Sequence, residues 1–445
     1  MRTSALARLI VMGALLVALL IPLNMVQSVV SERASRRGSV VDEIAATWGG
    51  VQTIGGPVLT VPFRYIENEA EGKSRVAQAF FLPEAFDVKG TMEPQVLVRG
   101  LFKVVVYKAH LALSGRFVRP DFTGIRPAAQ PLWDDATLSV GVADPRGIAK
   151  RAVLKWNGGD VTLVPGVENS GLFSTGLRGA VGLVPSAADA GSLPFALDLE
   201  VNGSRELKLL PAGSETTVQL TSTWPHPSFI GTPLPAFRES SAAGFTGRWT
   251  VPYFGRGYPP RWTSIGSDVA QAKARADGSA LGVGLLRPVD IYQQAERAVK
   301  YAALFIVMTF VVFFLWEIVR SRLLHPIQYL FVGFAMCVFY LLLVSISEHL
   351  GFDLAYASAA GATTLLIAGY SFHVLGGLMA GGIMGAGLIT LYGFLYLLLR
   401  LEDYALLAGS VGLFAMLALL MFITRRVNWY DLRLGESAIG DQGSA

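Results

Sequence analysis

Two kinds of hydrophobic pattern alternate along this chain. Long apolar runs lie near the N-terminus and in the C-terminal third, and short alternating segments fill the region between them. An apolar run of about 18 to 25 residues is long enough for a helix to cross about 30 Å of hydrocarbon. The predicted spans are 9–30, 301–319, 327–346, 354–372, 375–399 and 404–424. The pattern therefore predicts a multi-pass membrane protein with one large water-soluble domain after its first span.

Charged residues are scarce in the C-terminal third, and they lie in tight groups between the apolar runs. Those between positions 301 and 424 are Glu317, Arg320, Arg322, Glu348, Asp353, Arg400, Glu402 and Asp403. A backbone in lipid must satisfy its own hydrogen bonds, and a helix does this within one segment. We therefore predict a bundle of five transmembrane helices over residues 301–426, followed by a tail at 427–445.

The first apolar run, within residues 1–30, follows Arg2 and Arg8 and resembles a secretory signal. It is long for a signal, and no clear small-x-small cleavage site follows it. We therefore favour an uncleaved signal anchor, with a cleaved signal as the alternative.

Basic residues near the span ends indicate the orientation, because short loops rich in Lys and Arg stay cytoplasmic. If the chain crosses the membrane six times, four further arginines lie on the same side as Arg2 and Arg8. These anchoring residues are Arg320, Arg322, Arg425 and Arg426. Both termini are then cytoplasmic, and residues 31–300 face outward. The basic residues that disagree are Arg33, Arg36, Arg37, Arg297 and Lys300. They flank a long domain, and long domains translocate largely regardless of charge.

Within residues 31–300, the stretch from Val51 to about Leu286 shows the alternation of half-buried strands, with turn residues between them. Asn202-Gly203 lies between two alternating segments, and Asn157-Gly158 lies between 153–156 and 161–164. Asn-Gly is the strongest short hairpin signal, because both turn positions need positive φ. Further strands are predicted at 96–107, 111–117, 137–142, 217–223 and 245–251.

The fold class predicted for these residues is an antiparallel, β-rich, sandwich-like domain. Its edges read as helical. One helix is expected at 40–48, and another opens at a capping box formed by Asp290 and Gln293.

Composition excludes several classes of function. The net charge is +4, and no Lys/Arg run exceeds two residues, so no nucleic-acid partner is expected. The single cysteine, Cys337, lies in an apolar run, so the soluble domain has no internal disulfide. No metalloprotease, phosphate-binding or serine-hydrolase motif occurs in that domain. We therefore predict no catalytic, cofactor-binding or metal-binding residue and no cofactor.

Six segments make the chain resemble a known family. They are WPHPSFIG (224–231), VDIYQ (289–293), KYAALF (300–305), HPIQY (325–329), SISEHLGF (345–352) and LEDYALLAGS (401–410). Together they resemble the CreD family of bacterial inner-membrane proteins, the cell-envelope integrity family linked to colicin tolerance.

The resemblance implies a multi-pass inner-membrane protein whose residues 31–300 are periplasmic and whose expression accompanies an envelope stress response. It implies no reaction, so no catalytic residue is carried over. We expect a non-enzymatic protein that maintains envelope integrity through a periplasmic binding, sensing or scaffolding domain. Its expected partners are the lipid bilayer and an unknown envelope protein or ligand. A lipid or small-solute transporter and a membrane-embedded enzyme of envelope metabolism are the alternatives.

The predicted topology brings the polar residues of two short loops to the outer face. This candidate outer cluster consists of Glu348, His349, Asp353, Arg400, Glu402 and Asp403. Ionisable groups at that depth either reach the interface or pair with each other. The cluster is then either an interfacial collar that stops the helices sliding, or a docking or sensing surface that includes a titratable histidine.

Gly377, Gly381 and Gly385 recur at four-residue spacing in the fifth span. Small residues at this spacing let two helix backbones approach closely in lipid. Gly361 and Ala360 in the fourth span are candidates for the opposing surface. The glycine stripe could serve three purposes: helix packing within one chain, contact between chains in a homo-oligomer, or a deformable seam between helices for transport.

Overall fold

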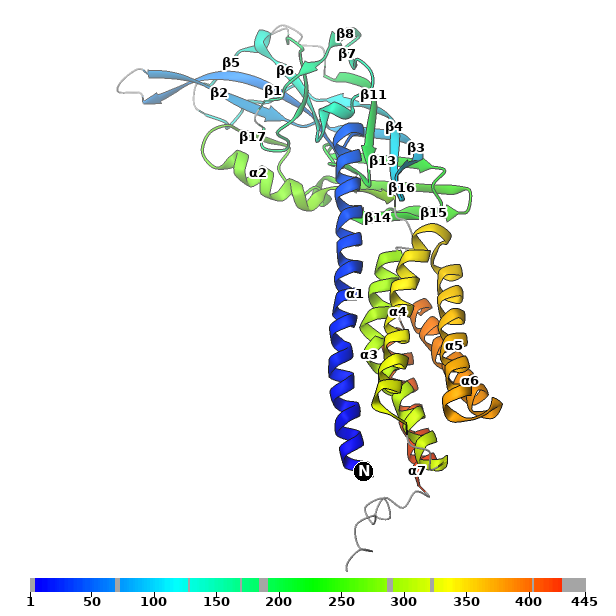
Figure 1. The fold of residues 1–445 in the computed structure, drawn as a ribbon. Helices are drawn as coiled ribbons and strands as arrows, with labels where there is room; N and C mark the ends of the chain where they lie inside the picture. Colours follow the sequence, from blue (N-terminus) through cyan, green and yellow to red (C-terminus); the bar gives the residue numbers. More distant parts are fainter. Residues whose placement is uncertain are drawn as a thin grey trace, which may run out of the picture. The chain divides into compact units, whose positions relative to one another are not determined.

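The chain forms two compact units (Figure 1). The computed structural model describes residues 5–68, 73–126, 129–168, 170–183, 191–285, 291–320, 324–401 and 404–425. The helical unit combines Met1–Arg37 with Val289–Ala445, and the β-rich unit is Gly38–Pro288. In the sequence, the β-rich unit is therefore inserted between the first apolar helix and the rest of the helical unit.

Among the described residues, six helices are long and apolar enough to cross a membrane, judged by length and composition alone. They are α1 (Ala5–Trp48), α3 (Ile291–Arg320), α4 (Pro326–Leu350), α5 (Phe352–Leu375), α6 (Leu378–Arg400) and α7 (Ala405–Thr424). The helix expected at 40–48 is the continuation of α1. The capping box expected at Asp290 lies outside the described residues.

Small and aromatic side chains hold the helical unit together. A Cβ at Gly333 of α4 would overlap the Leu19 side chain, so α1 and α4 pack closely there. The Tyr356 hydroxyl of α5 donates a hydrogen bond to the Tyr392 carbonyl of α6 at 2.6 Å. The Phe339 ring of α4 lies 4.5 Å from the Tyr392 ring, centroid to centroid. These contacts link α1, α4, α5 and α6 in one apolar core.

The β-rich unit contains two sheets. The ten-stranded sheet consists of β1 (Gln52–Asn68), β2 (Lys73–Phe81), β5 (Gln130–Pro131), β6 (Thr137–Val142), β9 (Val164–Pro165), β10 (Gly176–Ala180), β12 (Glu206–Leu209), β14 (Pro227–Gly231), β17 (Arg261–Thr263) and β18 (Leu281–Leu285). Its main path runs β14-β18-β12-β1-β6-β10-β9, with β2, β5 and β17 off that path.

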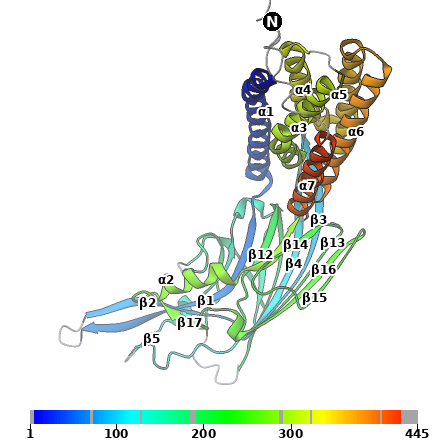
Figure 2. The same cartoon turned by 90° about the horizontal axis from the view of Figure 1, so that it is seen from below.

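The eight-stranded sheet runs in the order β15-β16-β13-β3-β4-β11-β7-β8. Its strands are β3 (Ala85–Arg99), β4 (Phe102–Phe117), β7 (Val153–Trp156), β8 (Gly159–Thr162), β11 (Leu193–Ser204), β13 (Glu215–Ser222), β15 (Phe237–Ser241) and β16 (Gly244–Pro252). Strands β13, β16 and β15 lie side by side in Figure 2. Among the described residues of the unit there are also the end of α1, a further helix, α2 (Asp268–Ala276), and four short 3-10 helices.

Side chains from both sheets form one hydrophobic core. In β11 the alternate residues Phe195, Leu197 and Leu199 are at most 4% exposed, as the alternation in the sequence predicts. Most strand pairs are antiparallel. However, β1 pairs with β12 and β13 pairs with β3 in parallel, so the sheets are mixed rather than purely antiparallel.

The hairpin predicted at Asn202-Gly203 is wrong. Both residues stay in β11, opposite Lys108 and Tyr107 of β4, and β12 belongs to the other sheet. The chain turns instead at Arg205, whose φ is +63°. Glycine is needed at position 203 because a Cβ there would overlap the Tyr107 ring.

The single strand predicted at 96–107 is two strands. β3 ends at Arg99 and β4 begins at Phe102, with Gly100 at φ +60° in the turn between them. Apolar residues lie on both sides of Gly100, so the sequence pattern did not reveal the turn between the two strands.

The hairpin predicted at Asn157-Gly158 is confirmed. β7 and β8 pair antiparallel, with φ of +47° at Asn157 and +86° at Gly158. Both central residues thus adopt the positive φ that a tight type I′ turn requires.

Candidate functional site

The predicted outer cluster falls into two groups with different partners. The first group joins three helices at Glu348 of α4, whose side chain is 7% exposed. Its carboxylate accepts a 3.0 Å hydrogen bond from the Tyr292 hydroxyl of α3. Arg33 of α1 lies 3.8 Å from the same oxygen, Nε to Oε1. This nearly buried carboxylate therefore has both a hydrogen-bond donor and a positive charge beside it.

The second group joins α5 and α6. Arg400 Nη2 lies 2.7 Å from Asp353 Oδ2, and the Tyr396 hydroxyl donates a 3.1 Å hydrogen bond to Asp353 Oδ1. Both members of the ion pair are about half exposed. His349 is exposed, and Glu402 and Asp403 lie outside the described residues. Asp353 and Arg400 are therefore the predicted cluster members that the structure brings together.

Sequence reasoning missed Arg33 and Tyr292 as partners of Glu348. Arg33 follows the first apolar run by three residues, and Tyr292 lies in one of the segments that carry the family resemblance. Their positions just outside apolar runs were the available signal, but the choice of partner depends on helix packing.

A buried carboxylate near the other end of α3 was also missed as a contact between helices. Glu317 is 4% exposed and accepts a 2.9 Å hydrogen bond from the Tyr329 hydroxyl of α4. A hydrogen bond of this kind lowers the cost of placing a carboxylate among apolar helices.

The glycine stripe brings α6 close to α5. A Cβ at Gly381 would lie 2.9 Å from the Ala368 carbonyl oxygen, and one at Gly385 would lie 3.3 Å from the Ala368 Cβ. Gly377 precedes α6 with φ +142°, and a Cβ there would meet no atom within 4 Å. The predicted opposing residue, Gly361, likewise has open space around it. The neighbours of the stripe are therefore Ala368 and Phe372.

The predicted anchoring arginines are described only in part. Arg320 is the last residue of α3. The Arg425 guanidinium lies 4.0 Å from the centroid of the Phe422 ring. Arg322 and Arg426 lie outside the described residues.

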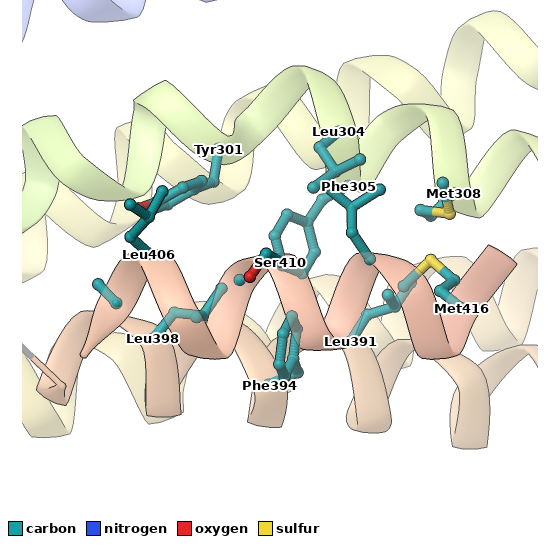
Figure 3. Close-up of a pocket in the computed structure, with 13 residues that line it drawn as sticks. Tyr301, Leu304, Phe305, Met308, Leu391, Phe394, Leu398, Leu406, Ser410 and Met416 are labelled. Carbon is teal, nitrogen blue, oxygen red and sulfur yellow. The ribbon is translucent and has the colours of Figure 1, made fainter.

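A cavity of about 250 Å³ lies between α3, α6 and α7 (Figure 3). Side chains of α3, among them Leu304 and Phe305, face Ser410 and Met416 of α7 across it, and Phe394 of α6 closes another side. No lining residue is charged. The cavity is somewhat smaller than a typical small-molecule site, which has a volume of roughly 300–1,000 Å³. Its apolar walls suit a hydrocarbon chain rather than an ion.

The β-rich unit has a polar groove of about 590 Å³ over β3, β13, β15 and β16. The Ser and Thr residues that line it are Thr91, Thr221, Ser222, Thr223, Ser241 and Thr246, beside Met92, Pro94, Ala243, Gly244 and Phe245. Glu93 and Glu239 add two carboxylates. Hydroxyls donate and accept hydrogen bonds and carboxylates accept them, so the groove suits a ligand with several hydroxyl or amine groups.

A line of ionisable side chains continues from this groove across the sheet. His110 of β4 lies 3.8 Å from the Glu93 carboxylate and 3.5 Å from that of Glu200 in β11. The Lys150 ammonium, 2.6 Å from the Glu200 carboxylate, lowers the pKa of Glu200. The Glu200 carboxylate therefore remains charged at neutral pH.

In the described part of the chain, no group of three or more His, Cys, Asp or Glu side chains could hold a metal ion.

Comparison with known proteins gives the family. The model of the CreD family, described as inner membrane protein CreD, matches residues 4–430. Inner membrane protein CreD of Escherichia coli (strain K12) is 33% identical over 429 residues, which cover 95% of this chain and 93% of the relative. The chain belongs to the CreD family. The family description and the six apolar helices together make it an inner-membrane protein.

Solved structures of an M1 zinc metallopeptidase from Deinococcus radiodurans also match part of this CreD-family chain. Two of them have TM-scores of 0.19 and 0.20 and identities of 13% and 12%, over 46% of this chain and 42% of theirs. This likeness carries no argument about fold or reaction.

Proposed function

We propose that this CreD-family protein maintains the cell envelope without catalysing a reaction, and that its β-rich unit binds an envelope ligand in the polar groove. The observation that carries the proposal is the groove itself, because six Ser and Thr residues and two glutamates are among the residues that line it. This lining matches a hydroxyl-rich ligand, such as a glycan of the cell envelope. Sensing or scaffolding would follow from occupancy of the same site.

The proposed orientation places the groove on the periplasmic side. Arg320, Arg322, Arg425 and Arg426 support it, because short basic loops stay cytoplasmic. The β-rich unit, Gly38–Pro288, then meets the envelope, and the helical unit anchors it.

A complementation assay tests the proposal. A strain that lacks the gene receives either the parent protein or a variant that carries both Glu93→Gln and Glu239→Gln. Both carboxylates line the groove, so we expect the variant to leave the strain sensitive to detergent and β-lactams. The matched control is Asp160→Asn, which changes an exposed carboxylate on β8 at the far edge of the same sheet. Equal complementation by all three proteins would overturn the proposal.

A second candidate is transport of a lipid or small apolar solute. It is favoured by the uncharged cavity between α3, α6 and α7 and by the close α5–α6 contact at Gly381. Flux into proteoliposomes should then fall with Gly381→Leu. Absence of flux with the parent protein would dispose of this candidate without affecting the first.

A further inference from the structure

The cavity between α3, α6 and α7 reaches from the surface of the helical unit to its core. Leu406 and Leu413 line it from α7 and are 86% and 46% exposed. Phe305 of α3 also lines it, yet this residue is 2% exposed and belongs to the hydrophobic core of the unit. In an inner-membrane protein, acyl chains surround apolar helices of this length. The cavity therefore opens toward hydrocarbon.

The cavity has about the length of one lipid leaflet. The ion pair between Asp353, at the start of α5, and Arg400, at the end of α6, marks the polar end of these two helices. On α6 the lining lies within residues 391–398, so its far end is about 14 Å from Arg400 at about 1.5 Å per residue. On α7 the lining spans residues 405–416, which is about 17 Å. Half of a hydrocarbon core of about 30 Å is about 15 Å, so the cavity matches one layer of acyl chains.

The two ends of the cavity differ in chemistry. Tyr301 lies beside Leu406 at one end (Figure 3). Met308 and Met416 lie at the other end, and flexible methionine side chains fit irregular apolar guests. A tyrosine suits the boundary where acyl chains give way to polar groups. The Ser410 hydroxyl donates to a carbonyl of its own helix at 3.0 Å, so it requires no polar guest.

The space is not the result of a detached helix. α7 touches α6 at Gly412, where a Cβ would overlap the Phe394 ring. Protein interiors contain few voids larger than a water molecule, because an empty space forfeits the contacts of its walls. A cavity of about 250 Å³ beside this close contact is therefore expected to contain a guest. The uncharged lining and the opening toward hydrocarbon favour an acyl chain as that guest.

We propose that the cavity holds one acyl chain of a membrane phospholipid. Its ester end lies near Tyr301, and the chain extends toward Met308 and Met416. The chain then completes the packing between α3 and α7. This inference is independent of any ligand in the polar groove, and it requires no transport of the bound lipid.

Photolabelling of the full-length protein tests this. The protein is reconstituted in vesicles of phosphatidylethanolamine and phosphatidylglycerol, in which part of the phosphatidylethanolamine carries a diazirine along one acyl chain. Light attaches this chain to the side chains that it touches, and mass spectrometry of peptides locates them. We expect label on Phe305, although it is 2% exposed, because the cavity leads from the lipid to its ring. Phe310, which is 0% exposed on the same helix and does not line the cavity, should carry severalfold less label.

Filling the cavity should prevent the labelling. Gly409 lines it, and the nearest atom to a Cβ there would be Leu398 Cδ2 at 3.9 Å, so Gly409→Leu places its side chain in the space. Label on Phe305 should fall severalfold in this variant and stay unchanged in Gly393→Leu, where a Cβ on α6 outside the lining would meet no atom within 4 Å. Ser410→Leu is the second filling variant, in case Gly409→Leu does not fold. The proposal would be overturned if the parent protein carried no more label on Phe305 than on Phe310, as when α7 or a second copy of the chain closed the cavity. Equal labelling of Phe305 in the filling variants and in Gly393→Leu would also overturn it.

Discussion

Asp144 illustrates how one carboxylate can join distant parts of the chain. Its Oδ2 accepts the Gly50 backbone N–H at 3.0 Å, just beyond the end of α1. Arg146 Nε donates to its Oδ1 at 2.8 Å. Its backbone carbonyl accepts a hydrogen bond from Gln52 Nε2, which also donates to the Asn202 carbonyl. Asp144 therefore joins the loop after β6 to the start of the first strand, and Gln52 of that strand joins both to the end of β11.

This network predicts a pH-dependent stability. The hydrogen bond from Arg146 holds the pKa of Asp144 below its usual range. A carboxyl whose pKa is lower in the folded state stabilises the fold above its unfolded pKa, about 3.9, and loses that contribution as the pH falls through the folded value. Asp144→Asn should therefore destabilise the β-rich unit at pH 7 by about 1 kcal/mol. The difference from the parent protein should be smaller at pH 3 than at pH 7, because pH 3 lies below the unfolded pKa.

The measurement is the denaturation midpoint from tryptophan fluorescence at both pH values. Asp160→Asn, on an exposed residue, serves as the control and should change neither midpoint by a comparable amount. A gap for Asp144→Asn that is as large at pH 3 as at pH 7 would show that the charge of Asp144 is not the cause.

The contact between Tyr292 and Glu348 predicts a second residue-scale effect. Tyr292→Phe removes the hydroxyl that donates to a carboxylate only 7% exposed. Hydrogen bonds to charged groups contribute about 1.5–3 kcal/mol, so the apparent melting temperature in detergent should fall measurably. Tyr404→Phe removes a hydroxyl from an exposed side chain (64%) and should leave it unchanged. Equal midpoints for the two variants would contradict the assigned role of this hydrogen bond.

At the scale of secondary structure, the sequence was sufficient where the decisive interactions are local. The apolar runs correspond to α1 and α3–α7, because spanning length depends on each segment alone. Asn157-Gly158 formed its predicted turn. The same dipeptide at Asn202-Gly203 did not, because β4 continues alongside β11 and the Tyr107 ring needs a residue without a side chain.

Partner choice was harder to predict than the elements themselves. The sequence placed Glu348 and Asp353 in one loop region, yet they bond to different helices. Their partners, Arg33 and Arg400, lie far away in the sequence and on opposite sides of the β-rich insertion. The polar groove was not predicted either, since it combines residues of four strands whose order only the folded sheet defines.

The α5–α6 contact supplies a prediction about helix packing. Gly381→Leu forces a side chain against the Ala368 carbonyl, and such overpacking costs about 1–3 kcal/mol. The apparent melting temperature in detergent should therefore drop. Gly382→Leu changes the adjacent residue of the same helix, where a Cβ meets nothing within 4 Å, and should be tolerated. If both variants melted alike, close approach at position 381 would not be what stabilises the pair.

For the molecule as a whole, the proposed orientation predicts which segments a protease reaches. Protease added to intact spheroplasts should cleave within the β-rich unit, Gly38–Pro288, while an epitope after position 445 stays protected until the membrane is permeabilised. Immunoblotting of the fragments measures both. Digestion of the epitope with protection of the β-rich unit would require the opposite orientation.

The insertion of the β-rich unit also has a consequence during translation. Leu19 packs against Gly333, but 314 residues separate their positions on the ribosome. At about 5–20 residues per second, this interval lasts about 15–60 s. Throughout it, the first helix must remain in the bilayer without its final neighbours, exposed to membrane insertases and quality-control proteases.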